Sequence, residues 1–130
     1  MSDLVTFAHA LSDTTRWRIV RLVMDHAMCI CELADILDMP QSSISSHVQI
    51  LRKTGLLESE RCGKWSYFRI DGRYLKVVRD LEQFFEGSGS KIWKDDDSCA
   101  VKRLAQRAES CCPGPQKLTP RHRKREHAKP

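Results

Sequence analysis

Two cysteines separated by a single residue are the most chemically suggestive feature of this chain. Cys29 and Cys31 lie within the short segment of residues 28–33. Thiolates are soft ligands that select thiophilic metal ions, and two of them on one short segment can bind the same ion. Alternatively, both are small half-buried side chains, because free cysteine packs well in protein interiors. We favour a metal site, whose role depends on the elements around it.

The composition is that of a globular domain. The chain has 130 residues, 41% of them hydrophobic and 30% charged, which suffices for one domain with a modest core. No apolar run approaches the roughly 18 residues of a membrane helix, and the N-terminus lacks the features of a signal peptide. We therefore expect a cytoplasmic protein without a membrane partner, whose six cysteines are ligands or free thiols rather than disulfides.

The net charge of +5 is concentrated at the C-terminus. Residues 117–130 hold six cations and one carboxylate, so the first 116 residues are neutral overall. This tail has no apolar anchor, and we predict that it is disordered and adds non-specific affinity for DNA. Residues 41–69 carry a local net charge of +3, and there we expect contacts with phosphates.

Hydrophobic periodicity predicts five helices and one hairpin. The order is ααααββα, which is mainly α-helical and is that of a winged helix-turn-helix, with the hairpin as the wing. The glycine- and serine-rich residues 87–90 then separate a domain of residues 1–86 from an extension, 87–116, with a short helix at 102–109. The other helices are predicted at residues 2–11, directly after Asp13, at 29–37, from 41 or 42 to 54, and at 72–86, and the strands at 56–62 and 65–70.

The second predicted helix has one apolar face. That face is formed by Ile19, Val20, Val23 and Met24. We expect Arg16, Arg18 and Arg21 to remain in solvent.

The fourth predicted helix has the surface of a DNA reader. Ile44, Val48 and Leu51 form its apolar ridge, and His47 is expected half-buried at the edge of that ridge. The opposite face carries hydroxyls, amides and cations, which bind base edges and phosphates. An ordinary solvent-facing surface is the alternative, but the preceding helix, the tight turn and the basic hairpin favour DNA binding. The predicted contacts are Gln41, Ser42, Ser43, Ser45, Ser46, Gln49, Arg52 and Lys53, with Arg61 and Lys64 at the hairpin tip.

Together these segments resemble the ArsR/SmtB family of bacterial arsenic- and metal-responsive repressors. The resemblance covers residues 3–86 and implies a winged-helix homodimer that represses an operon until an inducer binds. Apolar residues at both ends of the domain support a dimer: Leu4, Phe7, Leu11, Leu75, Val78 and Phe85. The segments that carry the resemblance are LSDTTRWRI (residues 11–19), QSSISSHV (41–48) with LRKTGL (51–56), and GK (63–64) with YFRI (67–70).

The resemblance also locates a metal site. The family's best-known metal box is a Cys-x-Cys on the third helix, and residues 28–33 match it. Arsenic-sensing members usually carry a third cysteine three residues further on, where this chain has Ala34. The zinc site that other members build on the last helix needs histidines, and residues 72–86 contain none.

The third thiol is left open by the sequence. Trivalent arsenic and antimony take three thiolates in a pyramid, and Cys29 and Cys31 supply two. A third comes from Cys62, from the other subunit, from a solvent ligand or from the C-terminal cysteines, which also form a candidate site by themselves. We favour the third-helix pair because it adjoins the DNA-reading helix. The C-terminal cysteines are Cys99, Cys111 and Cys112.

The favoured hypothesis is a non-enzymatic repressor that binds a double-stranded DNA operator as a homodimer. Its expected inducer is trivalent arsenic or antimony, as arsenite or a methylated arsenical, with no organic cofactor. Cadmium, lead or zinc is the alternative inducer. A thiol oxidoreductase or arsenate reductase is disfavoured, because the chain lacks a Cys-x-x-Cys after a strand and a cysteine followed by a phosphate-binding loop. A metal-carrying module is the third possibility.

Overall fold

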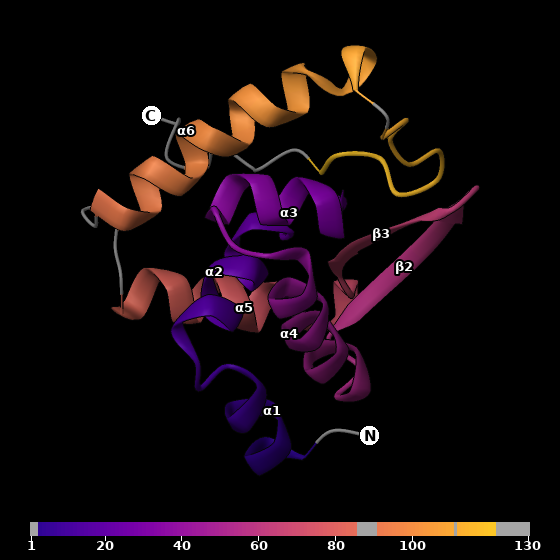
Figure 1. Cartoon of the computed structure of the whole chain (residues 1–130). Coiled ribbons are helices and arrows are strands. Elements are labelled where there is room, and N and C mark those ends of the chain that lie inside the picture. The colour runs from indigo at the N-terminus through magenta and orange to yellow at the C-terminus, as the bar shows by residue number, and fades with distance from the viewer. Residues whose placement is uncertain (1–2, 86–90, 111, 122–130) are drawn as a thin grey trace, which may run out of the picture.

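A computed structural model describes residues 3–85, 91–110 and 112–121 of the chain. It confirms the predicted winged helix-turn-helix (Figure 1). Within the described ranges, none of the helices combines the length and apolar character that crossing a membrane requires. The elements are α1 (Leu4–Ala10), α2 (Thr14–Leu22), β1 (Met28–Cys29), α3 (Ile30–Leu37), α4 (Gln41–Lys53), β2 (Leu57–Cys62), β3 (Trp65–Ile70), α5 (Gly72–Phe85), α6 (Lys91–Ala105) and the 3₁₀ turn η1 (Arg107–Glu109).

Local signals explain where α2 begins and where α4 ends. The Asp13 carboxylate accepts a hydrogen bond from the Arg16 N–H at 3.1 Å, so the predicted N-cap of α2 is confirmed. After α4, Gly55 adopts a φ of 82°, a left-handed conformation that glycine tolerates and that ends a helix. The buried ridge of α4 is also confirmed, since Ile44, Val48 and Leu51 are at most 1% exposed.

The sheet has one strand more than predicted. β2 and β3 form the expected antiparallel hairpin, with Cys62 opposite Trp65 and Gly63 at a φ of 62°. The two-residue strand β1 pairs with β3, which places Cys29 opposite Tyr67. The third helix therefore begins at Ile30 rather than Cys29, and Cys29 is fixed by the sheet on one side and the helix on the other.

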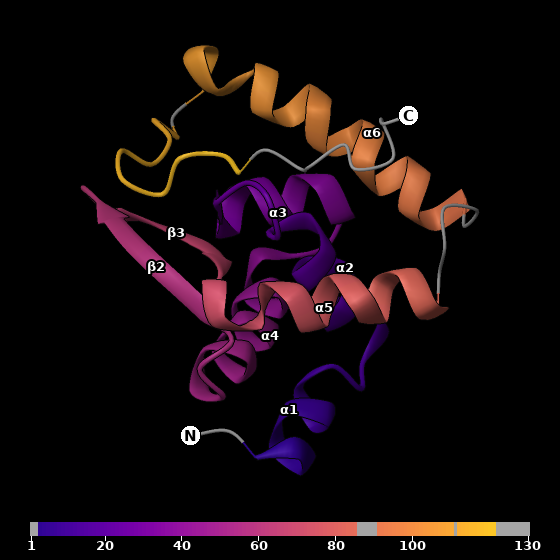
Figure 2. The same cartoon turned by 180° about the vertical axis from the view of Figure 1, so that it is seen from behind.

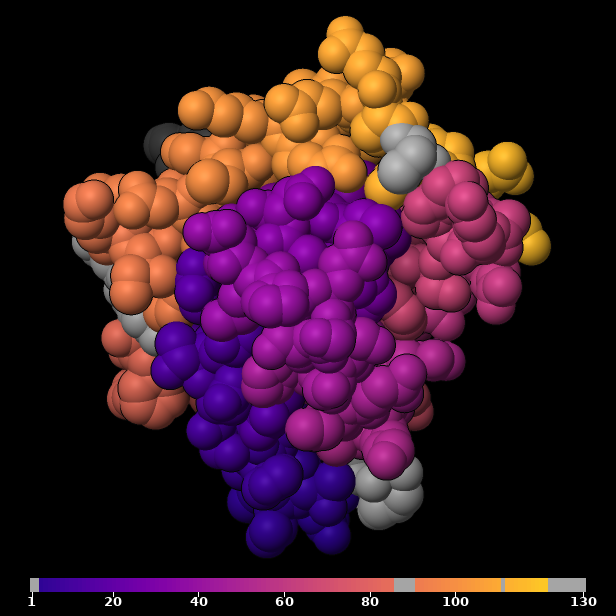
Figure 3. Space-filling view, viewed as in Figure 1, coloured from indigo at the N-terminus to yellow at the C-terminus, as the bar shows by residue number. Residues whose placement is uncertain are grey.

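Helix α6 is longer than the predicted 102–109 helix and covers α3. It starts at Lys91, and η1 follows its end. Figures 1 and 2 show α6 lying across α3, with the hairpin beside α4. In the space-filling view, the α6 segment forms a continuous layer over this end of the molecule (Figure 3). Of the described part of the extension, residues 91–110 thus pack on the winged domain.

The prediction that three α2 arginines remain in solvent is wrong. Arg16 is 7% exposed and its Nε donates to the Ala10 carbonyl at 2.7 Å. Arg18 pairs with Asp96 of α6 at 2.8 Å, and Arg21 pairs with Glu82 of α5 at 2.7 Å. Arg18 and Arg21 are covered because α6 and α5 bring buried carboxylates to them, and Arg16 is held by the backbone that precedes α2. The periodicity of α2 reveals none of these contacts.

Residues 112–121 form an ordered segment that we call the C-terminal strap. The Glu60 carboxylate of β2 accepts hydrogen bonds from the backbone N–H groups of Gln116, Lys117 and Leu118 at 2.9, 2.8 and 2.9 Å. Arg121 donates to Glu58 at 3.0 Å. Residues 117–121 therefore differ from the predicted disordered tail, because acidic side chains of β2 bind them. The rest of that tail, 122–130, lies outside the described residues.

Candidate metal centre and nucleic-acid interface

Three cysteines from distant parts of the chain meet beside the start of α3. The Sγ atoms of Cys29, Cys31 and Cys112 all lie within 4.8 Å of one another, and those of Cys29 and Cys112 are 3.5 Å apart. Cys29 ends β1, Cys31 lies in the first turn of α3, and Cys112 begins the strap. Three convergent sulfur atoms match the ligand set of a thiophilic ion.

The structure thus joins one member of the C-terminal cysteine group to the third-helix pair. Cys99 is exposed on α6 and does not belong to the cluster. Cys111 lies outside the described residues. Cys62 is half-buried on β2, where its thiol donates to Glu60 at 3.2 Å. Among the described residues, Cys112 is therefore the third thiol of the site.

A buried ion pair lies next to the thiols and contacts the backbone of Cys29. Glu32 is 0% exposed, and its carboxylate accepts a hydrogen bond from the Cys29 N–H at 3.1 Å. The Arg107 guanidinium of η1 donates to both Glu32 oxygens at 2.6 and 2.9 Å and to the Ala27 carbonyl at 2.6 Å. This pair fixes the start of α3 and anchors the segment that leads to Cys112. The spacing Cys29-x-x-Glu32 is that of a capping box and could have revealed Glu32, whereas no sequence signal pointed to Arg107.

The start of the strap is held against β3. The backbone N–H of Gly114 donates to the Tyr67 hydroxyl at 2.7 Å. Gly114 adopts a φ of 94°, and a Cβ there would meet the Arg107 side chain at 3.4 Å. Burial raises the pKa of Tyr67 to about 12, so the hydroxyl stays neutral. These contacts place Cys112 next to Cys29 in a small apolar cluster that also contains Ala27 and Tyr67.

The thiols lie in an environment that disfavours free thiolates at Cys29. Burial raises the pKa of the Cys29 thiol far above its usual value, and the neighbouring Glu32 carboxylate raises it further. Cys29 is therefore protonated at neutral pH until a ligand displaces the proton.

The predicted DNA-reading face of α4 is open to solvent. His47 is half-buried, as expected, with its Nδ1 3.3 Å from an Arg16 nitrogen. Arg52 lies over the Phe68 ring, 5.6 Å from its centroid, which orients its guanidinium between α4 and the sheet. Ser45 is half-buried, and the other predicted contacts of this helix are exposed, namely Gln41, Ser42, Ser43, Ser46, Gln49, Arg52 and Lys53.

The hairpin tip carries two exposed cations, Arg61 and Lys64. The Arg61 Nε donates to the Gly63 carbonyl at 2.9 Å, and the Lys64 ammonium lies 5.2 Å from the Trp65 ring centroid. Both contacts hold the cations at the tip, where a wing can reach phosphate.

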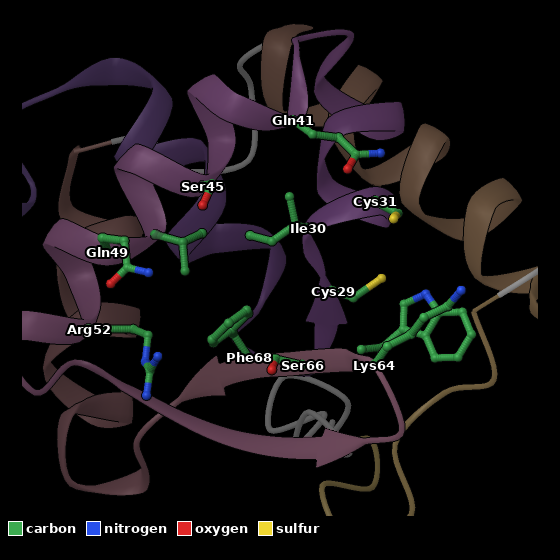
Figure 4. A pocket seen from close by; sticks show the side chains of 12 residues that line it. Cys29, Ile30, Cys31, Gln41, Ser45, Gln49, Arg52, Lys64, Ser66 and Phe68 are labelled. Carbon is green, nitrogen blue, oxygen red and sulfur yellow. The ribbon is translucent and has the colours of Figure 1, made fainter.

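A groove connects the thiols to the predicted DNA contacts. It has a volume of ≈ 540 Å³ and runs between α3, α4 and the hairpin. Cys29 and Cys31 line one part, and Gln49, Arg52 and Lys64 line others (Figure 4). A ligand at the thiols is therefore adjacent to the elements that would contact DNA.

The known proteins that are similar to this chain are described as regulators. Residues 13–59 match the family described as "Bacterial regulatory protein, arsR family". The arsenic resistance transcriptional regulator ArsR2 of Pseudomonas putida is 32% identical over 107 residues, 79% of this chain and 92% of that protein. The cadmium resistance transcriptional regulatory protein CadC of Listeria innocua is 34% identical over 77 residues, 58% of this chain and 63% of that protein. An ArsR-like transcriptional regulator from Rhodococcus sp. RHA1 superposes with a TM-score of 0.52 at 30% identity, covering 79% of this chain and 90% of that one.

Proposed function

The chain belongs to the arsR family of bacterial regulatory proteins, and we propose that it is a repressor released from operator DNA by a thiophilic ion. Members of this family are DNA-binding regulators of transcription and not enzymes. The observation that carries the proposal is the convergence of Cys29, Cys31 and Cys112 within 4.8 Å beside the helix-turn-helix.

Trivalent arsenic or antimony is the inducer that this ligand set favours. Both elements take three thiolates in a pyramid. Three thiolates neutralise a trivalent ion completely, which suits a site where Cys29 and Cys112 are 2% and 0% exposed, because uncompensated charge is costly to bury. A methylated trivalent arsenical has two exchangeable positions and would use two of the three thiols. The similar proteins include one named for arsenic resistance.

The DNA-binding form is proposed to be a homodimer. Leu4 and Val5 of α1 are 77% and 76% exposed, and Phe84 and Phe85 of α5 are 81% and 71% exposed. Apolar surface of this kind marks a contact with another protein, and a second copy would place two α4 helices about 34 Å apart, one turn of DNA. Val78, which the sequence assigned to this surface, instead lies in the core at 0% exposure. Figure 2 shows the face on which α5 lies.

Two routes connect the thiols to the DNA-contacting elements. Cys31 belongs to α3, which packs on α4. Cys112 belongs to the strap, which is bound to Glu60 of β2 and Tyr67 of β3. An ion that draws Cys112 onto α3 would shift the wing relative to the reading helix, because packed elements move as rigid units. We expect a loss of affinity of about 5- to 150-fold, which corresponds to a typical coupling free energy.

The test is operator binding by fluorescence anisotropy, on DNA from upstream of the chain's own gene. Arsenite should lower the affinity of the wild-type protein. Cys112→Ser and the double variant Cys29→Ser with Cys31→Ser should bind DNA normally without arsenite and lose most of the response. Cys99→Ser is the matched control, because this thiol is exposed outside the cluster, and it should respond fully. A normal response in the Cys29/Cys31 double variant would rule out this site as the sensor.

A further inference from the structure

Arg103 of α6 brings a largely buried guanidinium to the thiol cluster. Its side chain is 10% exposed, and its Nη2 lies 3.7 Å from the Cys112 Sγ. Its Nε donates to the Asp35 carboxylate at 2.8 Å. Its Nη1 is buried without a hydrogen-bond partner among the described residues. Among the described residues, this guanidinium has one carboxylate partner, Asp35, and its Nη1 has no acceptor.

The other charges beside the thiols are already matched. Glu32, which is fully buried, is paired through both oxygens with Arg107. The side chain of Asp35, the carboxylate that binds Arg103, is 62% exposed, so solvent screens its attraction to the guanidinium. Asp35 therefore compensates the charge of Arg103 only in part, and the rest can act on an ion held by the thiols.

The charge of a three-thiolate complex depends on the ion. A trivalent ion gives a neutral complex, whereas a soft divalent cation such as Cd(II) leaves one negative charge. In a buried site, that charge is costly unless a cation compensates it. Hydrogen bonds from a guanidinium to an anionic acceptor are among the stronger polar contacts in proteins.

We propose that Arg103 is a specificity-determining residue that allows this site to bind a soft divalent cation, with Cd(II) as the probe, in addition to trivalent arsenic. The inference rests on the proposed function, because it assumes that Cys29, Cys31 and Cys112 bind the ion. Arg103 makes no bond to the metal; it compensates the remaining negative charge through Cys112. Without Arg103, the site keeps its three sulfur atoms but selects the trivalent ion.

The experiment compares the affinities of the full-length protein for Cd(II) and for arsenite, each by competition titration at one pH. The wild type should bind both ions. Arg103→Gln should bind Cd(II) at least tenfold more weakly and arsenite within threefold of the wild type. Arg103→Lys retains the charge and should recover most of the Cd(II) affinity. Lys102→Gln is the matched control, because it removes an exposed charge from the neighbouring position and should change neither affinity.

The outcomes separate the two ideas. If Arg103→Gln weakens both ions alike, Arg103 only holds α6 on α3 through Asp35, and the inference is overturned. It is overturned equally if neither affinity changes, or if the wild type binds arsenite but not Cd(II). If Cys112→Ser binds both ions as tightly as the wild type does, the proposed three-thiol site itself is wrong.

Discussion

The sulfur atoms of Cys29 and Cys112 lie 3.5 Å apart although the two residues are 83 positions apart in the sequence. An ion bound to both therefore closes a long loop and fastens the strap to the start of α3. The same strap is bound to both wing strands through Glu60 and Tyr67. This single contact thus links the candidate thiol site to the wing strands and to α3, which packs on α4.

Removing the charge of Glu32 should destabilise the whole domain. In Glu32→Gln, the Arg107 guanidinium loses the carboxylate that it contacts at 2.6 Å, and breaking a buried pair in this way costs about 3–5 kcal/mol. Urea denaturation measures this loss in the free energy of unfolding. Glu109→Gln is the control, because Glu109 is exposed on η1 and should change stability by about 0.5 kcal/mol or less. A loss below about 1 kcal/mol in Glu32→Gln would show that the pair is not a structural support.

The attachment of the strap through Glu60 should weaken at acid pH. Burial raises the pKa of Glu60, but hydrogen bonds from the backbone N–H groups of Leu118, Gln116 and Lys117 outweigh it and lower the pKa to about 2 from 4.5. A lowered pKa in the folded state means that the stabilisation is present above pH 4.5 and is lost as the pH falls towards 2. The difference in free energy of unfolding between wild type and Glu60→Gln should therefore shrink across this window. A difference that stays constant with pH would contradict this assignment.

Gln49 and Lys64 should contribute to DNA binding in different ways. Gln49→Ala should cost about 1–3 kcal/mol on the operator if Gln49 makes a bidentate base contact, and little on unrelated DNA. Lys64→Gln should weaken binding to all sequences and reduce the slope of log K against log salt by about 0.9. Anisotropy titrations at several salt concentrations measure both effects, with the exposed Lys94→Gln on α6 as the control. Unchanged operator affinity in both variants would show that this face does not contact the DNA.

A charge on the exposed apolar end of α5 should dissociate the dimer. Phe85 is 71% exposed, and Phe85→Glu would place a carboxylate in the proposed interface, where it cannot be solvated. Sedimentation equilibrium at micromolar concentration should find a dimer for the wild type and a monomer for the variant. Val101→Glu is the matched control, since Val101 is 70% exposed on α6 and should remain dimeric. A wild-type monomer would contradict the proposed assembly.

Local pattern is sufficient to predict the helix-turn-helix and the hairpin. Ile44, Val48 and Leu51 repeat at helical spacing, and Gly55 and Gly63 occupy turns that their neighbours specify. These signals depend on residues close in the sequence, so the winged helix and the open face of α4 could be predicted from them.

The completed thiol cluster and its surroundings could not be predicted in the same way. Strand β1 has two residues, too few to show an alternating pattern, and its pairing with β3 is what fixes Cys29. The choice of Cys112 over Cys99 depends on the path of the strap, which is set by Glu60 and Tyr67. Likewise, Arg18 is half-buried where it pairs with Asp96 of α6, which lies 78 positions later in the sequence. Each of these is a long-range contact that no local periodicity encodes.

The most direct test of the central claim is the coordination number of bound arsenic, measured by X-ray absorption on the arsenite-loaded protein. The three-thiol site requires three sulfur neighbours in the wild type and in Cys99→Ser, and two sulfur neighbours with one oxygen in Cys112→Ser. Three sulfur neighbours that persist in Cys112→Ser, or only two in the wild type, would contradict the account.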